Sequence, residues 1–278
     1  MAKNQERALL KPHAPQENWR ALAFSPDGKL LAGSGSAIVL WDIEKNQYQS
    51  HFNGSSAGLA WTSDSKFLVD VGGRAHLRVW HVEKRRLHVE YTSNQYYADA
   101  VAIASNGKDL VLGTSGGCVF VKEPFVVERP WERDTRPLPL PLPHWRVEPI
   151  GMTAAVSPGC QRFASSDMEG TLTLGGLETA QTQIFVKAHK SWAFALTFSA
   201  DGLTLASGGA DRSIKLWDAI TGDPLATLTG HTDRISGLAF SPNGKTLASG
   251  SFDRTVKLWD VSKVMKKKAG GIKGVRVD

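Results

Sequence analysis

The sequence predicts an all-β protein that is built from repeated units. The first observation is a phrase that occurs twice, as LASGGADRSIKLWD at residues 205–218 and as LASGSFDRTVKLWD at residues 247–260. The second is the strand-like alternation of apolar residues in runs such as ISGLAF and TVKLWD, which are separated by turn sequences such as SPNGK. No window with helical periodicity competes with these runs, so helices are not expected in the body of the chain.

The repeated phrase belongs to a longer unit. Residues 189–218 align without a gap to residues 231–260, and 16 of the 30 positions match. Four weaker copies begin near residues 19, 57, 99 and 152. Because repeats at such a period indicate arrays of similar supersecondary units, we expect six units, near residues 14–52, 53–92, 93–146, 147–186, 187–228 and 229–261.

Each unit is read as a sheet of four strands. Three strands are connected by two turns, and a preceding segment such as PLATLTG supplies the fourth strand. Such a sheet cannot bury both of its faces alone, so neighbouring sheets must pack face to face, and radial closure leaves only short edges. The expected architecture is a β-propeller of six four-stranded blades. Residues 8–13 (ALLKPH) resemble the segment that precedes the last repeat, so this N-terminal strand is expected to close the ring.

The Trp-Asp ending, the SPDG-type turn and the His near the first strand resemble the WD40-repeat β-propeller family. The resemblance covers residues 8–261, which we expect to form a single WD40 domain, and it is most specific in the last two repeats. Seven blades are commoner in that family, so seven remains the alternative to six. The resemblance also implies a hydrogen-bonded chain within each complete repeat. Its members would be His189, Ser207, Asp211 and Trp217, and then His231, Ser249, Asp253 and Trp259.

The first four repeats depart from this pattern, so we expect their blades to depend on apolar packing and the last two blades to be the most stable. The departures are Gly33 in repeat one, Asp70 and Arg74 in repeat two, Leu112 and Gly116 in repeat three, and Ser165, Glu169 and Gly175 in repeat four.

A Ser, a His and an Asp could also form a hydrolase triad. The set occurs twice in the same register, however, and neither Ser207 nor Ser249 lies in a G-x-S-x-G sequence, which favours the structural role. His76, His81 and His88 do not have the spacing of zinc ligands, and no phosphate-binding glycine motif opens a helix. We therefore expect no catalytic residue, no cofactor and no metal, and the protein is not expected to be an enzyme.

The longest gap between repeats contains RPLPLPLPHW, with prolines at 137, 139, 141 and 143. Proline at every second position removes the N–H donors from one edge of a strand and leaves the other edge able to pair. One hypothesis makes residues 137–143 the outer edge strand of blade three. The alternative is an extended loop, and a spacing of two does not fit a PxxP ligand.

What remains is a binding function. The resemblance places two sets of turns on one face of the ring, and aromatic and Arg residues there are of the types that dominate interfaces. Our leading hypothesis is a non-catalytic scaffold that binds a protein or peptide partner on this face. For Phe194 and Met152, packing between blades is the alternative. The predicted face comprises Asn18, Arg20, Tyr97, Asp99, Ile150, Met152, Trp192, Phe194, Arg234 and Phe252.

Two other functions stay open at this point. The propeller could serve an enzyme or a regulatory subunit in substrate recognition, or the basic residues 262–278, expected to be a flexible tail, could associate weakly with nucleic acid. The net charge of +6 lies mostly in the two ends of the chain, so nucleic acid is not the expected partner. The chain has only two cysteines, Cys118 and Cys160, which favours a reducing compartment, and we expect a cytoplasmic protein. It has no apolar stretch long enough to span a membrane, so no membrane partner is expected. We expect the protein to be monomeric by itself.

Overall fold

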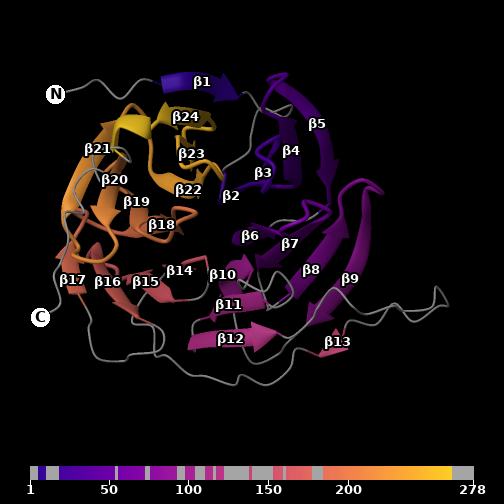
Figure 1. Ribbon diagram of the computed structural model, residues 1–278, viewed down its shortest axis with the longest axis horizontal. Helices are drawn as coiled ribbons and strands as arrows, with labels where there is room; N and C mark the ends of the chain where they lie inside the picture. Colours follow the sequence, from indigo (N-terminus) through magenta and orange to yellow (C-terminus); the bar gives the residue numbers. More distant parts are fainter. Residues whose placement is uncertain are drawn as a thin grey trace, which may run out of the picture.

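A computed structural model provides the structure of the protein. It describes residues 6–10, 19–53, 56–72, 76–92, 98–103, 110–114, 117–121, 138–139, 153–158, 161–176 and 184–264. Within these residues the chain is all-β, and its sheets are arranged around a central axis (Figure 1). This confirms the predicted class and the β-propeller. No helix among the described residues has the length and apolar character needed to cross a membrane.

The first half of the described chain forms three sheets, named here in chain order, each antiparallel within its hairpins. Sheet one contains β2 (Ala21–Phe24), β3 (Leu30–Ser34), β4 (Ile38–Asp42) and β5 (Gln47–Phe52); sheet two contains β6 (Gly58–Trp61), β7 (Phe67–Gly72), β8 (His76–His81) and β9 (Arg86–Thr92), with β13 (Leu138–Pro139) added; sheet three contains β10 (Ala98–Ile103), β11 (Leu110–Thr114) and β12 (Gly117–Val121).

The second half repeats this arrangement. Sheet four contains β14 (Thr153–Val156), β15 (Arg162–Ser166), β16 (Thr171–Gly176) and β17 (Ile184–Lys187); sheet five contains β18 (Ala193–Phe198), β19 (Thr204–Gly209), β20 (Ser213–Asp218) and β21 (Pro224–Thr229); sheet six contains β22 (Ile235–Phe240), β23 (Thr246–Ser251), β24 (Val256–Asp260) and, at its outer edge, β1 (Glu6–Leu10).

The turn between the first two strands of a unit is set by its own sequence. In sheet one the Ser25 hydroxyl donates to Asp27 at 2.5 Å and accepts from the backbone N–H of Leu30 at 2.9 Å. Gly28 follows with a φ of +73°, a conformation that glycine adopts without strain. The same hydroxyl-centred turn recurs at Thr62, Ser199 and Ser241. SPDG and its variants therefore fix the hairpin register.

The prediction of four strands in every sheet is wrong for two sheets. In the described residues, sheet three has three strands and sheet two has five. The fifth is β13, in which Leu138 and Pro139 run parallel to Tyr91 and Thr92 of β9. Residues 138–139 therefore do not border blade three, as one hypothesis had it; the other residues of the range 137–143 lie outside the described chain. An edge position suits proline, which has no N–H to donate to a further strand. The strand with which Leu138 and Pro139 pair, however, is β9 of sheet two.

Buried apolar side chains lie between consecutive sheets. Between sheets one and two the cluster includes Leu40, Leu59 and Leu68, and between sheets five and six it includes Leu216 and Leu238. A fully buried side chain of this size contributes about 1.5–3 kcal/mol relative to exposure. Each sheet is therefore stabilised mainly by its neighbours.

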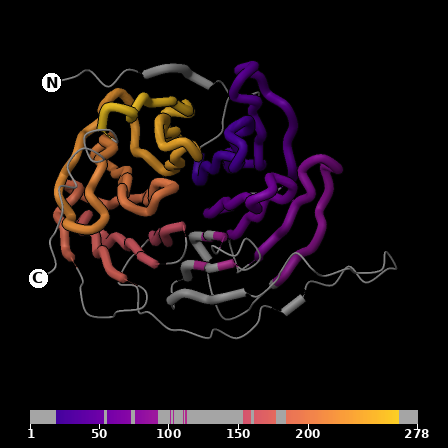
Figure 2. The backbone as a smooth tube through the Cα atoms, in the orientation of Figure 1, coloured from indigo at the N-terminus to yellow at the C-terminus, as the bar shows by residue number. Residues whose placement is uncertain are grey.

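The first and last parts of the chain meet at one seam, where indigo and yellow segments lie side by side (Figure 2). Sheet six packs on sheet one through a cluster that includes Trp19, Trp41 and Leu258. At the outer edge of sheet six, β1 pairs antiparallel with β24, with Leu10 opposite Val256. The two ends of the domain are thus joined both by packing and by backbone hydrogen bonds.

Gly250 provides a test of this seam, because a Cβ there would lie 2.6 Å from Cβ of Trp19, an atom that cannot move without the backbone. We predict that Gly250→Ala lowers the free energy of unfolding by about 2 kcal/mol through overpacking. The measurement is urea unfolding. Gly237→Ala is the matched control, since its nearest contacts across the same seam, on Ala21 and Leu22, are at 3.4 Å. Equal stability of the two variants would contradict the close approach.

Candidate functional site

The complete hydrogen-bonded chains lie in sheets five and six. In sheet five, His189 joins Asp211 through Nδ1 at 3.0 Å and Ser207 through Nε2 at 2.8 Å, and Trp217 Nε1 donates to the same hydroxyl at 2.9 Å. Because an indole N–H can only donate, the Ser207 oxygen accepts from Trp217. Burial favours the neutral form of His189, and Asp211 is ionised, so Nδ1–H donates to Asp211 and Nε2 accepts from the Ser207 hydroxyl.

Sheet six repeats the arrangement. His231 lies 2.7 Å from both Asp253 and Ser249, and Trp259 Nε1 donates to Ser249 at 2.8 Å. The two hydroxyls, of Ser207 and Ser249, have no exposed surface. A nucleophile must reach its substrate, so these sets tie strands together and are not hydrolase triads.

The electrostatics of the chains follow from burial. Burial lowers the pKa of His189 below its ordinary value, and the bond to Asp211 opposes this only in part. For Asp211 and Asp253 burial acts to raise the pKa, but bonds from Ser213 and Thr255 respectively, with those from the two histidines, outweigh it and hold both values below the ordinary one. The neutral histidine beside an ionised aspartate is therefore the favoured state near neutral pH.

Sheet two corrects an expectation. It was predicted to depend on apolar packing alone, but Asp70 stands at the Ser position and accepts from Trp80 Nε1 at 2.5 Å and from Arg78 at 2.6 Å. Burial raises the pKa of Asp70, and the Arg78 guanidinium opposes the rise. An isolated buried carboxylate would be costly, and Arg78 supplies the compensating charge. The signal was present in the sequence as Asp70 together with an Arg two residues before the Trp; Arg74 lies outside the described residues.

Among the described residues, sheets one and four contain no such chain, as expected. At Gly33 the space is occupied by the indoles of Trp19 and Trp41, whose centroids are 4.9 Å apart and whose buried N–H groups have no partner in the described part of the chain. In sheet four a Cβ at Gly175 would lie 2.5 Å from the Phe163 ring, and the buried Ser165 hydroxyl has no described partner. Aromatic rings have thus replaced the hydrogen bonds.

The pair Ser207 and Ser165 tests the value of the chain. Ser207→Ala leaves both His189 and Trp217 without their partner, so we predict a loss of about 2 kcal/mol in the free energy of unfolding. Ser165→Ala removes a hydroxyl that has no partner among the described residues, and we predict a change of less than about 0.5 kcal/mol. Urea unfolding measures both. A loss at Ser165 as large as that at Ser207 would show that the hydrogen bonds are not its cause.

The histidine chain also makes stability depend on pH. Because the pKa of His189 is lower in the folded state, the unfolded chain binds more protons below about pH 6.5, so the free energy of unfolding falls on acidification from pH 7.5 to pH 5.5. Asp211 and Asp253 add a further loss only below about pH 4. We predict that His189→Gln reduces the slope of the free energy of unfolding against pH; an unaltered slope in this variant would contradict the assignment.

Four residues of the predicted partner face converge on sheets five and six. The Arg234 guanidinium carbon lies 3.7 Å from the centroid of the Phe252 ring and 5.4 Å from that of Phe194. The Trp192 and Phe194 rings are 5.4 Å apart, and Trp192 is 37% exposed. Trp192, Phe194, Arg234 and Phe252 are called the cation–aromatic cluster below.

The β-ladders position this cluster. Ile235 of β22 pairs with Ser251 of β23, and the Phe252 N–H donates to the Arg234 carbonyl at 3.1 Å, so the two side chains are cross-strand neighbours. In sheet five the Ala210 N–H donates to the Trp192 carbonyl at 2.8 Å in the equivalent place. Side chains held on strand ends in this way are better fixed than side chains on long loops.

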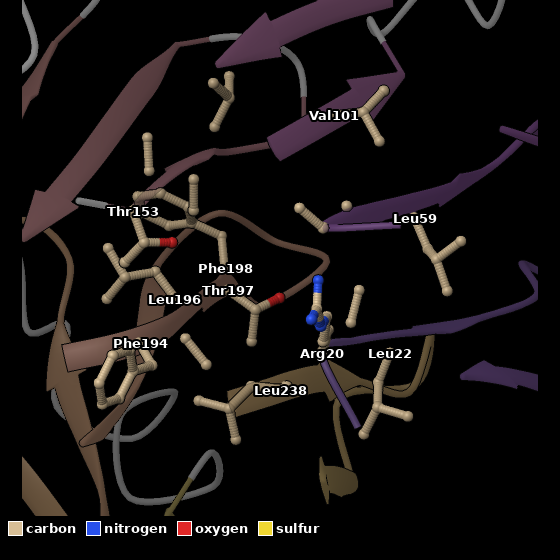
Figure 3. A pocket seen from close by; sticks show the side chains of 18 of the residues that line it. Arg20, Leu22, Leu59, Val101, Thr153, Phe194, Leu196, Thr197, Phe198 and Leu238 are labelled. Atoms are coloured by element: carbon tan, nitrogen blue, oxygen red, sulfur yellow. The ribbon is translucent and has the colours of Figure 1, made fainter. Parts of the chain in front are cut away.

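Arg20 lies elsewhere on the predicted face, beside a cavity of about 260 Å³ on the axis. The cavity is lined from the innermost strand of every sheet, and in Figure 3 the Arg20 side chain points into it. Arg20 is the one charged residue of the described lining, and Phe194 belongs both to the lining and to the cation–aromatic cluster. The cluster and the cavity are therefore continuous.

The remaining residues of the predicted face cannot be placed by this structure. Asn18, Tyr97, Ile150 and Met152 lie outside the described residues, and Asp99 lies in β10 without a described side chain. Phe194 is only partly buried, so it contributes both to packing and to the surface. In the part of the chain that the structure describes, no group of three or more His, Cys, Asp and Glu residues could hold a metal ion.

Comparison with known proteins adds family relationships. A family model described as "WD domain, G-beta repeat" matches residues 5–42, 180–218 and 222–260. Periodic tryptophan protein 2 from Arabidopsis thaliana is 24% identical over 238 residues, which are 84% of this chain and 25% of that protein. Target of rapamycin complex subunit LST8 from Bos taurus is 23% identical over 214 residues, 71% of this chain and 62% of the relative.

A third relative, WD repeat-containing protein 1 from Gallus gallus, is 36% identical over 211 residues, 70% of this chain and 32% of that protein. The chain thus matches between about a quarter and somewhat under two thirds of the length of these curated relatives.

Proposed function

Because the chain is a WD40-repeat β-propeller, we propose that it is a non-catalytic scaffold that binds a protein or peptide partner on the face that carries the cation–aromatic cluster. A relative supports the binding of a protein partner, since it is named as a subunit of the target of rapamycin complex. The non-catalytic part is supported by the burial of the Ser207 and Ser249 hydroxyls inside their sheets.

One observation carries the proposal. Trp192, Phe194, Arg234 and Phe252 come from two sheets and meet at one place on the surface, beside the axial cavity. Trp and Arg are the residue types that most often dominate binding energy, especially when they are held in a defined geometry. The cation–aromatic cluster contains both types, since Trp192 supplies an exposed indole and Arg234 a guanidinium stacked on Phe252.

We also infer that the protein is a ring of six blades closed by the N-terminal strand. The six sheets of the described residues and the pairing of β1 with β24 support this. A monomeric state and a cytoplasmic location belong to the same proposal, and the small number of cysteines supports a reducing compartment.

The test is a selection from a random peptide library on the immobilised protein. We predict that selected peptides bind Trp192→Ala at least about thirtyfold more weakly, as expected for a central interface residue, while its thermal unfolding is unchanged. Tyr48→Ala is the matched control, since Tyr48 is also 37% exposed but lies on the outer strand of sheet one. Equal binding to wild type and Trp192→Ala, or a selection without specific binders, would refute the proposed face.

A further inference from the structure

Arg234 is held in an unusual way for a surface cation. Its guanidinium lies over the rings of Phe252 and Phe194, so the planar group is packed on a face while its N–H edge is left for other partners. Its side chain is partly buried, which limits its rotamers before any ligand arrives. Less conformational entropy is then lost when a ligand binds.

The acidic groups nearest in sequence are engaged elsewhere. The Asp233 carboxylate accepts from the backbone N–H of Arg234 at 2.7 Å, and Asp253 is bound to His231 at 2.7 Å and to the Thr232 N–H at 3.0 Å. Among the described residues, no carboxylate lies within ion-pair distance of the Arg234 guanidinium. The described part of the chain therefore supplies no ion-pair partner for this charge.

A second arginine faces the same region. The Ser236 hydroxyl donates to the Trp19 carbonyl, which brings the strand that follows Arg234 against the segment that leads into Arg20. Arg20 is exposed and points into the axial cavity, whose other described lining residues are uncharged (Figure 3). Two guanidinium groups thus lie on neighbouring sheets: Arg20 at the axial cavity, and Arg234 over Phe194, whose ring contacts the partly exposed Trp192.

We infer that the partner is an acidic peptide in which carboxylates flank an apolar side chain. This inference rests on the proposed function and names the chemistry that the same face recognises. Arg234 donates two hydrogen bonds from its outer N–H edge to one carboxylate, in the geometry that guanidinium and carboxylate share. Arg20 donates to a second carboxylate, and the apolar side chain lies over Trp192 or enters the cavity. Ion pairs of this kind fix specificity and register as well as affinity.

The experiment uses fluorescein-labelled peptides and the full chain. The acidic probe contains Asp-Glu-Leu-Glu-Asp between Gly-Ser linkers, and its neutral counterpart contains Asn-Gln-Leu-Gln-Asn, which has the same shape without the charges. We expect fluorescence anisotropy to give at least about tenfold tighter binding of the acidic probe, with the difference reduced at raised salt. Equal binding of the two probes would overturn the inference.

Variants assign the effect to the cluster. We expect Arg234→Gln to weaken binding of the acidic probe at least about tenfold, and Arg234→Lys to weaken it less, because the charge remains but the planar two-bond geometry is lost. Arg85→Gln is the control, an exposed Arg in the turn between β8 and β9 at the opposite end of its sheet. An equal loss in Arg85→Gln would show attraction by net charge alone and would overturn the inference.

The outcome separates this inference from the function beneath it. If library peptides bind in a way that depends on Trp192 but carry no acidic residues, the scaffold function stands and the inference fails. If an oligothymidylate probe binds more tightly than the acidic peptide and loses affinity in Arg234→Gln, the cluster recognises a nucleic acid and the inference also fails. If no peptide depends on Trp192, the proposed function itself fails.

Discussion

Each sheet of this protein has two apolar faces that must be shielded from water, and the rest of the structure depends on that constraint. All six residues of β19 and all six residues of β22 are buried, although side chains along a strand point alternately to opposite faces. A strand with both faces buried needs a neighbour on each side. Sheets that all have this need are satisfied when each packs between two others around an axis, which is the arrangement in Figure 1.

Face-to-face packing also explains where small residues stand. Glycines of the second strands allow the sheets to approach: a Cβ at Gly208 would lie 2.5 Å from Ile235 of the next sheet, as one at Gly250 would meet Trp19. In sheets five and six the buried His, Ser, Asp and Trp groups are hydrogen-bonded to one another. Where the serine or the tryptophan is absent, an Asp–Arg pair or an additional ring occupies the space.

The same frame gives the candidate site its geometry. Arg234 precedes β22 and Phe252 follows β23, so the ladder that holds sheet six together also sets the distance between the guanidinium and the ring. Sheet five brings Trp192 and Phe194 to the same place by an equivalent pairing. A rigid ring thus presents a preorganised surface, and the chemistry of that surface is free to vary with the few residues at the strand ends.

Much of this could be predicted from the sequence, because the repeat carries its own register. The all-β class, the propeller and the positions of the eight residues in the two hydrogen-bonded chains follow from aligned motifs. The pairing of Asp70 with Arg78 could not be predicted from the family pattern, since it is a local substitution of one polar chain by another. The partner of Leu138 and Pro139 could not be predicted either, because the edge that accepts them is set by tertiary structure and not by chain order. The stacking of Arg234 on two rings needed coordinates.

The most direct test of the central claim is denaturant unfolding of the chain without residues 229–264, the last repeat. If each sheet needs a neighbour on both sides, this deletion exposes two sheet faces and leaves β1 without a partner. The account then predicts the loss of any cooperative unfolding transition. A transition that stays cooperative, with its dependence on denaturant reduced by only about a sixth, would mean that the sheets form an open stack and would contradict the account.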